Sequence, residues 1–265
     1  MNDVKNPFLL PNKAVAVGGY ILLNFIFGSV ILMLLGVIYN QTHHLGLGLN
    51  DITKIIAQTD MEQLQKEYMD LYIFSNALGN LLLYLCMFGV VVFFMRNYVV
   101  EDAKDLVKGY KKLAWLIPAC AIVGYAITYL VDLGIAMLVK QTSANQSSIE
   151  VLIQNGGAVY MFFAVVIFAP IVEELIYRKA IFEFLKTKHI AWSYAVSIVF
   201  FTFPHMITTF LDTSHTFLDN ILMSIPYMFS GFALCLTYHH CNKNVYASWF
   251  FHLINNLIAF IFIFM

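Results

Sequence analysis

The sequence contains few charged residues. Only 12% of its 265 residues are Asp, Glu, Lys or Arg, about half of the ~25% that is usual in soluble domains. The formal net charge is −1, so nothing indicates a nucleic-acid partner. Hydrophobic residues make up 60% of the chain, and the mean hydropathy is +0.75. The composition therefore excludes an ordinary soluble domain and indicates a protein embedded in lipid.

Cysteine is scarce as well. The four cysteines occur singly and form no CxxC pair, so neither a disulfide framework nor a zinc knuckle is expected. The HExxH pattern of one large class of zinc proteases is also absent. We see no internal repeat and no low-complexity tract, whereas many secondary transporters carry repeated halves.

What the sequence does contain is a series of long apolar segments. Each is long enough, at roughly 20 residues, to cross the hydrocarbon core as a helix. We therefore predict an all-α fold, a polytopic transmembrane helical bundle with about seven to eight spans. The predicted spans cover approximately residues 14–38, 72–95, 113–139, 157–185, 190–210, 219–240 and 244–265.

Lys and Arg are unevenly distributed over the predicted connections. Short cytoplasmic loops carry an excess of these residues, and the excess here falls on the side of the amino terminus. We predict a multi-pass protein of the cell membrane with a cytoplasmic amino terminus, and with polar connections outside at 40–70 and 140–150. The residues assigned to the cytoplasmic side are Lys5, Lys13, Arg96, Lys104, Lys108, Lys111, Lys112, Lys179, Lys186, Lys188 and Lys243, against Lys54, Lys66 and Lys140 outside.

One predicted span is interrupted by charge. Residues 159–172 have none, and Glu173, Glu174 and Arg178 follow. A charged side chain near a helix centre costs ~2.5–3.5 kcal/mol in the membrane, so the three cost roughly 8–10 kcal/mol before pairing. Glu174 and Arg178 have the i,i+4 spacing of a favourable pair, which leaves Glu173 without a local partner. Pro170 is expected to kink or restart the helix and to place both glutamates near a helix start, where the dipole favours anions.

Two later spans carry isolated polar side chains. His205 lies in a span without any formally charged residue. His252 and Asn256 stand at i and i+4 in the last span, so they share one helix face. Counted at ~1.5 Å per residue from the cytoplasmic ends, both histidines and Glu173 lie at membrane depth. We predict that these side chains line one polar cavity.

These residues resemble the three motifs of a known family, the CAAX protease and bacteriocin-processing (CPBP, also called Abi) family of intramembrane proteases. The family includes the Rce1-type prenyl-protein endopeptidases. The resemblance covers about residues 157–265 and implies a protease core at 151–265, in the four C-terminal helices. Residues 1–150 are then amino-terminal transmembrane helices and extracytoplasmic loops. The matching residues are Glu173, Glu174 and Arg178, then Phe201 and His205, then His252 and Asn256.

The resemblance implies an endopeptidase that uses water as its nucleophile. Peptide hydrolysis needs a base for the water, donors for the oxyanion and a proton for the leaving amine. Glu173 is expected to be the general base, with His205 helping to hold the water, and His252 and Asn256 are expected to face the oxyanion. The expected supporting residues are Glu174, Arg178 and Phe201.

The residues leave metal dependence open. A glutamate and two histidines could hold zinc with an open water position, and the ligands would then be Glu173, His205 and His252. The resemblance also supports a water activated by glutamate without a metal, which we favour. The expected partners are the lipid bilayer and a membrane-embedded or membrane-proximal peptide or protein substrate.

Several functions remain compatible with the sequence. Prenylated CAAX substrates are expected if the cell prenylates proteins. A composition rich in Lys, Asn, Ile and Phe suggests a low-GC bacterium, in which leader peptides, pheromones, membrane regulators or bacteriocin self-immunity are expected instead. A non-enzymatic scaffold or immunity protein that regulates a sensor or toxin is the main alternative, and a transporter has less support. Asp132, inside the third predicted span, is expected to pair with a neighbouring helix or to face water.

Overall fold

The computed structural model describes residues 9–58, 64–184, 190–212 and 216–265. Lys5, Lys186 and Lys188 lie outside this part of the chain. The described residues form helices and no strand, and the all-α prediction is confirmed. Among them, seven helices are long and apolar enough to cross a membrane, as predicted. These helices are Pro11–Thr42, Lys66–Lys108, Tyr110–Leu138, Ala144–Phe182, Ile190–Leu211, Phe217–His240 and Val245–Phe262.

Three of the spans are composite, because π-helical turns interrupt their α-helices. Such turns are rare and occur frequently at functional sites. The first span consists of α1 (Leu9–Leu22), η1 (Leu23–Phe27) and α2 (Gly28–Thr42). The second begins with a 3₁₀ turn, η2 (Lys66–Tyr68), and continues with α4 (Met69–Ile73), the π turn η3 (Phe74–Leu78) and α5 (Gly79–Lys108). The fourth consists of α7 (Ala144–Leu152), η4 (Ile153–Gly157), α8 (Ala158–Met161), η5 (Phe162–Phe168), α9 (Ala169–Glu173) and η6 (Glu174–Phe182).

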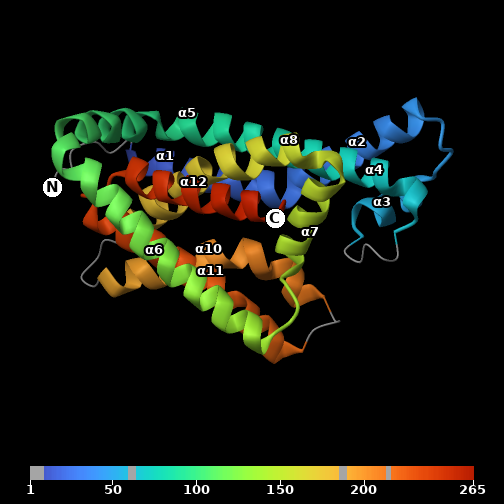
Figure 1. Ribbon diagram of the computed structural model, residues 1–265. Coiled ribbons are helices and arrows are strands. Elements are labelled where there is room, and N and C mark those ends of the chain that lie inside the picture. Colours follow the sequence, from blue (N-terminus) through green and yellow to red (C-terminus); the bar gives the residue numbers. More distant parts are fainter. Residues whose placement is uncertain (1–8, 59–63, 185–189, 213–215) are drawn as a thin grey trace.

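The long helices run back and forth between two ends of the bundle (Figure 1). The α5–α6 and α11–α12 connections lie at the left-hand end in Figure 1, together with the start of α1, and the α6–α7 connection lies towards the other end. Within the bundle, α11 packs against both α6 and α10, and α12 contacts α6, α11 and the fourth span. The remaining elements are α3 (Leu49–Ile56), α6 (Tyr110–Leu138), α10 (Ile190–Leu211), α11 (Phe217–His240) and α12 (Val245–Phe262).

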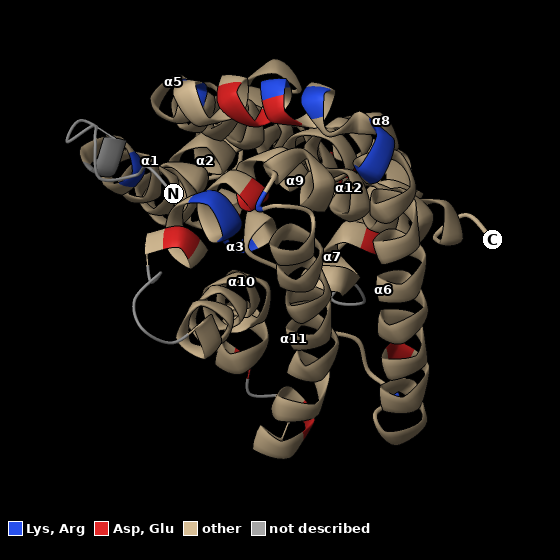
Figure 2. Ribbon diagram, turned by 90° about the vertical axis from the view of Figure 1, so that its left-hand side faces the viewer, with Lys and Arg blue, Asp and Glu red and all other residues tan. Residues whose placement is uncertain are grey.

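Most of the described Lys and Arg residues lie at one end of the bundle. Figure 2 shows charged residues around α5 and the neighbouring helix ends, whereas α10 and most of α6 and α11 carry none. The basic residues assigned to the cytoplasm that fall in the described part of the chain lie near the start of α1, along the end of α5, at the start of α6, in η6 and before α12. This separation is the one expected from the sequence, and the side of the membrane that each end faces stays a prediction.

A buried ionic network joins the helices at that end. Lys13 and Lys179 were predicted to lie in cytoplasmic segments, but only 8% and 7% of their surfaces are exposed. The Nζ atom of Lys13 lies 2.8 Å from Glu183 Oε2, and that of Lys179 lies 2.8 Å from Asp102 Oδ1. Burial by itself would raise the pKa of the Glu183 carboxyl, but the charges of Lys179 and Lys13 outweigh burial and lower it. Asp102 also accepts the backbone N–H of Val245 at 2.8 Å, so the network holds the first turn of α12.

The fourth span begins with a kinked turn between α7 and α8. Asn155 and Gly156 have non-helical backbone angles there, and φ of Gly156 is +102°, a conformation that glycine adopts without a steric penalty. The polar loop predicted at 140–150 is wrong from Ala144 onward, because α7 begins at that residue. Its start is held by the Ser143 cap, and Ala144 donates its N–H to the Thr209 hydroxyl at 3.0 Å.

Pro170 lies in the first turn of α9, where the helix changes from π to α, but the predicted free helix start does not form there. Phe168, which precedes α9, keeps helical angles of φ −83° and ψ −42°, so the backbone stays helical through the proline. Ala169 donates to the carbonyl of Ala164, five residues back, and this wider π turn accommodates the proline. Glu173 and Glu174 therefore do not lie at a free helix end, and the predicted stabilisation by a helix dipole does not apply. Their charges depend instead on side-chain partners.

Candidate active site

Glu173 lies at the end of α9 and only 3% of its surface is exposed. Its Oε1 atom accepts a hydrogen bond from the Tyr84 hydroxyl at 3.2 Å. Its Oε2 atom has no hydrogen-bond partner among the described residues. This oxygen lies 3.8 Å from His205 Nε2 and 3.9 Å from His252 Nε2. The structure therefore brings together three residues that the sequence places 32 and 47 positions apart along the chain.

The distances from Glu173 Oε2 to the two imidazole nitrogens fit one bridging atom between each pair. At 3.8 and 3.9 Å they are too long for direct hydrogen bonds. Two hydrogen bonds of about 2.8 Å to one shared atom span such a gap, as in a water-mediated contact. The carboxylate and both imidazoles thus face a position that suits one water molecule or one substrate oxygen.

Glu174 holds the second histidine from the opposite side. Its Oε1 atom lies 3.1 Å from His252 Nδ1 and 3.1 Å from Arg178 Nη1. An ionised carboxylate only accepts hydrogen bonds, so Nδ1 of His252 donates and its other nitrogen, Nε2, is the one near Glu173. The predicted i,i+4 pair of Glu174 and Arg178 is confirmed, with both side chains fully buried.

Arg178 also ties this pair to two other helices. Its Nη2 atom donates to the Gly231 carbonyl in α11 at 3.2 Å. Its guanidinium lies 4.7 Å from the centre of the Phe201 ring in α10. The same ring lies 5.0 Å from that of His205 and 5.8 Å from that of His252. Phe201 therefore packs against the buried cation and both imidazoles, which fits its expected supporting role.

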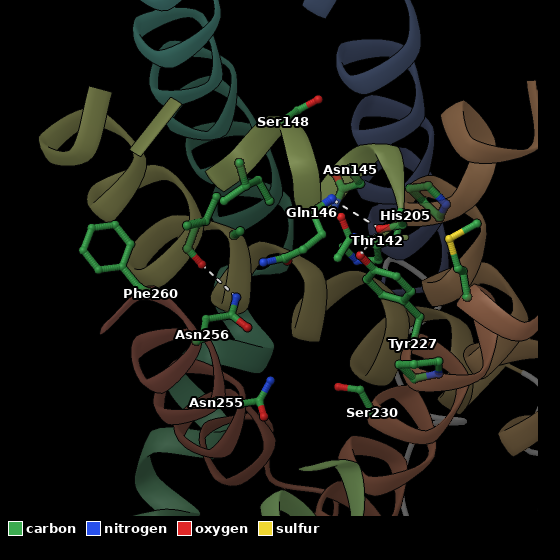
Figure 3. Close-up of a pocket in the computed structure, with 18 of the residues that line it drawn as sticks. Thr142, Asn145, Gln146, Ser148, His205, Tyr227, Ser230, Asn255, Asn256 and Phe260 are labelled. Atoms are coloured by element: carbon green, nitrogen blue, oxygen red, sulfur yellow. Dashed lines mark hydrogen bonds between the residues drawn. The ribbon is translucent and has the colours of Figure 1, made fainter. Parts of the chain in front are cut away.

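Asn256 has a partner that the sequence did not suggest. Its amide Nδ2 donates to the Val165 carbonyl at 2.8 Å (Figure 3). Since Ala169 donates to Ala164, the next carbonyl in this π pattern is Val165 and its donor would be Pro170. Proline has no backbone N–H, so the Asn256 amide supplies the missing donor. A primary amide has two N–H groups. Asn256 lines the cavity, and its second N–H is not used in the bond to Val165.

Two tyrosines of the site were also missed. Tyr84 contacts the Glu173 carboxylate from α5, outside the C-terminal segment that carries the motifs. Tyr227 stacks on His205 with ring centres 5.0 Å apart and planes at 10°, and its hydroxyl lies 2.8 Å from that of Ser143. Because the chain has 15 tyrosines, nothing in their spacing distinguishes these two.

All of these groups line one cavity of about 640 Å³, a size typical of ligand sites, which run from ~300 to 1,000 Å³. Figure 3 shows His205, Thr142 and Tyr227 on one side of it, with Asn255, Asn256 and Phe260 on the other. The predicted shared cavity is therefore present for Glu173, His205, His252 and Asn256.

The cavity runs from the buried glutamate towards the end of the bundle that holds the α6–α7 connection. At its inner end, Glu173 and His252 are only 3% and 4% exposed. Along its wall the exposure increases, and Asp132 and Lys140 are exposed. The opening thus lies away from the buried ionic network and the basic residues around it.

The possible zinc ligands lie slightly further apart than the ligands of a bound zinc ion. Bonds of ~2.0–2.1 Å in a tetrahedral zinc site place neighbouring ligand atoms roughly 3.4 Å apart, whereas Glu173 Oε2 lies 3.8 Å from His205 Nε2 and 3.9 Å from His252 Nε2. Across the described ranges of the chain, no group of three or more His, Cys, Asp or Glu residues is arranged to hold a metal ion. We therefore derive no chemical step that requires a metal.

Comparison with known proteins identifies the segment that contains these residues. Residues 155–258 match the family model described as type II CAAX prenyl endopeptidase Rce1-like. The match begins at the kink before α8, ends within α12 and contains all three motifs. No curated protein and no solved structure matches the chain significantly.

Proposed function

We propose that the protein is a membrane endopeptidase that hydrolyses a peptide bond with water activated by Glu173. The match of residues 155–258 to the Rce1-like family model supports this proposal. The observation that supports this most directly is the unpaired Oε2 atom of Glu173, which faces two imidazole nitrogens at 3.8 and 3.9 Å inside a cavity.

In the proposed reaction, Glu173 and His205 hold the attacking water. The Glu173 carboxylate removes a proton from the water as its oxygen attacks the carbonyl carbon of the substrate. The Tyr84 hydroxyl, bonded to the other carboxylate oxygen, orients Glu173 so that Oε2 points to the water. Glu173 then delivers the proton to the leaving amine as the C–N bond breaks, which returns the carboxylate to its starting state.

The developing oxyanion needs donors that are already in place. We assign this role to the second N–H of Asn256 and to His252 in its doubly protonated form, in which Nδ1–H donates to Glu174 and Nε2–H faces the oxyanion. Glu174 fixes the orientation of the His252 ring through Nδ1, in the way that the aspartate of a catalytic triad orients its histidine. Arg178 offsets the charge of Glu174, and we propose that both act as positioning residues.

The substrate is proposed to be a membrane-embedded or membrane-proximal peptide that enters at the exposed end of the cavity. With a cytoplasmic amino terminus, this end faces the extracytoplasmic side, because it lies opposite the start of α1. A leader peptide, a pheromone precursor or a membrane regulator fits this entry route.

The test is cleavage of a quenched fluorescent peptide library by the detergent-purified protein. We expect wild type to cleave and Glu173→Gln and His205→Ala to lose about 10²–10⁴-fold in rate, the range for loss of a general acid–base group. Glu101→Gln is the matched control, since Glu101 is exposed on α5 and does not line the cavity. Equal rates for wild type and Glu173→Gln would refute the proposed base.

The same assay addresses zinc. A tight zinc chelator is expected to leave the wild-type rate unchanged. Loss of activity with the chelator and its recovery on addition of zinc would replace the glutamate-only chemistry with a metal site at Glu173, His205 and His252.

The alternative is a non-enzymatic scaffold or immunity protein. It requires the folded bundle but not the Glu173 carboxylate. A Glu173→Gln protein that is produced normally and still performs the cellular role would favour this alternative.

A further inference from the structure

Asp132 is an acidic residue inside a membrane-spanning helix that the proposed chemistry does not use. It is the single acidic residue of α6, and it lines the same cavity as Glu173. Within the described part of the chain, its carboxylate has no hydrogen-bond or ion-pair partner. An intramembrane carboxylate is energetically costly and commonly marks a pathway or binding site for a polar group.

The orientation of α6 places this carboxylate on the cavity side. Thr128, Ile135 and Val139 line the cavity together with Asp132, and their spacing of three to four residues defines one helix face. The hydroxyl of Thr128 donates to its own helix at the Gly124 carbonyl, 3.1 Å away, so it does not neutralise Asp132.

The distance along α6 from the level of His252 to Asp132 can be estimated from a close contact between α6 and α12. A Cβ atom at Gly124 would lie 2.6 Å from the ring of Phe251, the residue before His252, so Gly124 lies beside the first turns of α12. Asp132 is eight residues further along α6, which corresponds to about 12 Å at 1.5 Å per residue. An extended peptide covers this distance in roughly three or four residues at ~3.3 Å each.

The charges on the cavity wall point to a cation as the group that Asp132 binds. Apart from Asp132, the formally charged residues lining the cavity are Glu173 at its inner end and Lys140 at its exposed end. Glu173 faces both histidines, and Lys140 forms no ion pair with Asp132 within the described part of the chain. Asp132 is therefore an unneutralised acid between the reaction centre and the opening.

We propose that Asp132 is a specificity-determining residue that binds a basic side chain of the substrate, Lys or Arg, roughly three or four residues from the scissile bond. The proposal deepens the proposed function and rests on it. It predicts that substrates are selected by charge at one position, in addition to any apolar contacts in the cavity.

The experiment compares peptides with both ends blocked, so that only side chains carry charge. Each peptide carries Lys, Gln or Glu at a single varied position, and the positions on both sides of the cleaved bond are varied in turn. Wild type is expected to prefer Lys over Gln by about tenfold in kcat/KM at the position that reaches Asp132. Asp132→Asn is expected to lose this preference through a lower kcat/KM for the Lys peptide, and Asp132→Lys is expected to prefer Glu there. Asp51→Asn is the control, because Asp51 lies in α3 outside the cavity.

Binding separates this proposal from the reaction itself. Fluorescence polarisation of the same labelled peptides is measured with Glu173→Gln and with the Glu173→Gln, Asp132→Asn double variant. Tighter binding of the Lys peptide that disappears in the double variant supports the recognition role, whether or not the peptides are cleaved. If this binding is observed but no peptide is cleaved by wild type, only the proposed function is overturned. An unchanged ratio of Lys to Gln binding and cleavage after loss of Asp132 would overturn the recognition role alone.

Discussion

The hydrogen bond from Asn256 to Val165 leads to a prediction about two residues that are far apart in sequence. If the Asn256 amide replaces the N–H that Pro170 lacks, the cost of losing Asn256 depends on what stands at position 170. Asn256→Ala leaves the Val165 carbonyl without its donor. In Pro170→Ala the new backbone N–H lies five residues after Val165 and is expected to take over that carbonyl.

The size of the effect follows from the state of the carbonyl. Leaving a buried acceptor unsatisfied costs ~1–3 kcal/mol, and this carbonyl bond is partly buried. We expect Asn256→Ala to destabilise the wild-type background by ~1–3 kcal/mol, and the Pro170→Ala background by less than ~1 kcal/mol. The coupling energy between the two positions is then about 1–2 kcal/mol, within the range measured for residues that share one hydrogen-bond network.

The assay is reversible unfolding of the detergent-purified protein, applied to the two single variants, the double variant and wild type. Asn255→Ala serves as the matched control, because Asn255 is the neighbouring asparagine and lines the cavity without a hydrogen bond to the fourth span in the described residues. Peptide cleavage is measured on the same samples.

The outcome that would refute the reasoning is an equal loss of stability from Asn256→Ala in both backgrounds. Cleavage gives a second comparison. If Pro170→Ala restores stability but not the rate, the remaining loss reports the proposed contact of the second Asn256 N–H with the oxyanion. Full recovery of both would assign Asn256 to helix positioning alone.

Three further results are expected. Tyr84→Phe removes the hydroxyl that orients Glu173 and is expected to lower kcat/KM about tenfold or more without unfolding the protein; an unchanged rate and pH profile would exclude this orienting role. The pKa of Glu183 is lowered in the folded protein. The ionised Glu183 therefore stabilises the fold above the ordinary glutamate pKa of ~4.3, and this stabilisation is lost as the pH falls through the pKa of Glu183 in the folded protein. Melting curves should accordingly show a steeper loss of stability below pH ~4.3 for wild type than for Glu183→Gln. In cells, a membrane-impermeant maleimide should label Lys140→Cys but not Lys108→Cys in a cysteine-free background, and the reverse pattern would invert the proposed orientation.

Much of the architecture could be predicted from local properties of the chain. A membrane span is specified by the length and apolarity of one segment, and all seven predicted segments correspond to helices of the structure. The Glu174–Arg178 pair could be predicted for the same reason, since an i,i+4 spacing depends only on helix geometry. The three motifs likewise predicted which side chains share a cavity.

The sequence-based predictions failed or were incomplete where backbone groups or side chains find hydrogen-bond or ion-pair partners that are distant in the sequence. Pro170 keeps a helical backbone because a π turn precedes it and because Asn256, 86 residues later, supplies a donor. Lys13 and Lys179 were assigned only to cytoplasmic segments, and the sequence does not show that both are buried against acidic residues of other helices. Pairing offsets part of the cost of burying a charge, and the sequence does not show which residue is the partner.

The sequence alone determined that this is an all-helical membrane protein, because apolar length is a local quantity, and its three polar motifs predicted that Glu173, His205 and His252 share a cavity. The tertiary structure decided the rest of the site. Tyr84 reaches Glu173 from α5, and Asp132 faces the cavity from α6. Both depend on how separate helices pack against one another, which no spacing within a single helix records.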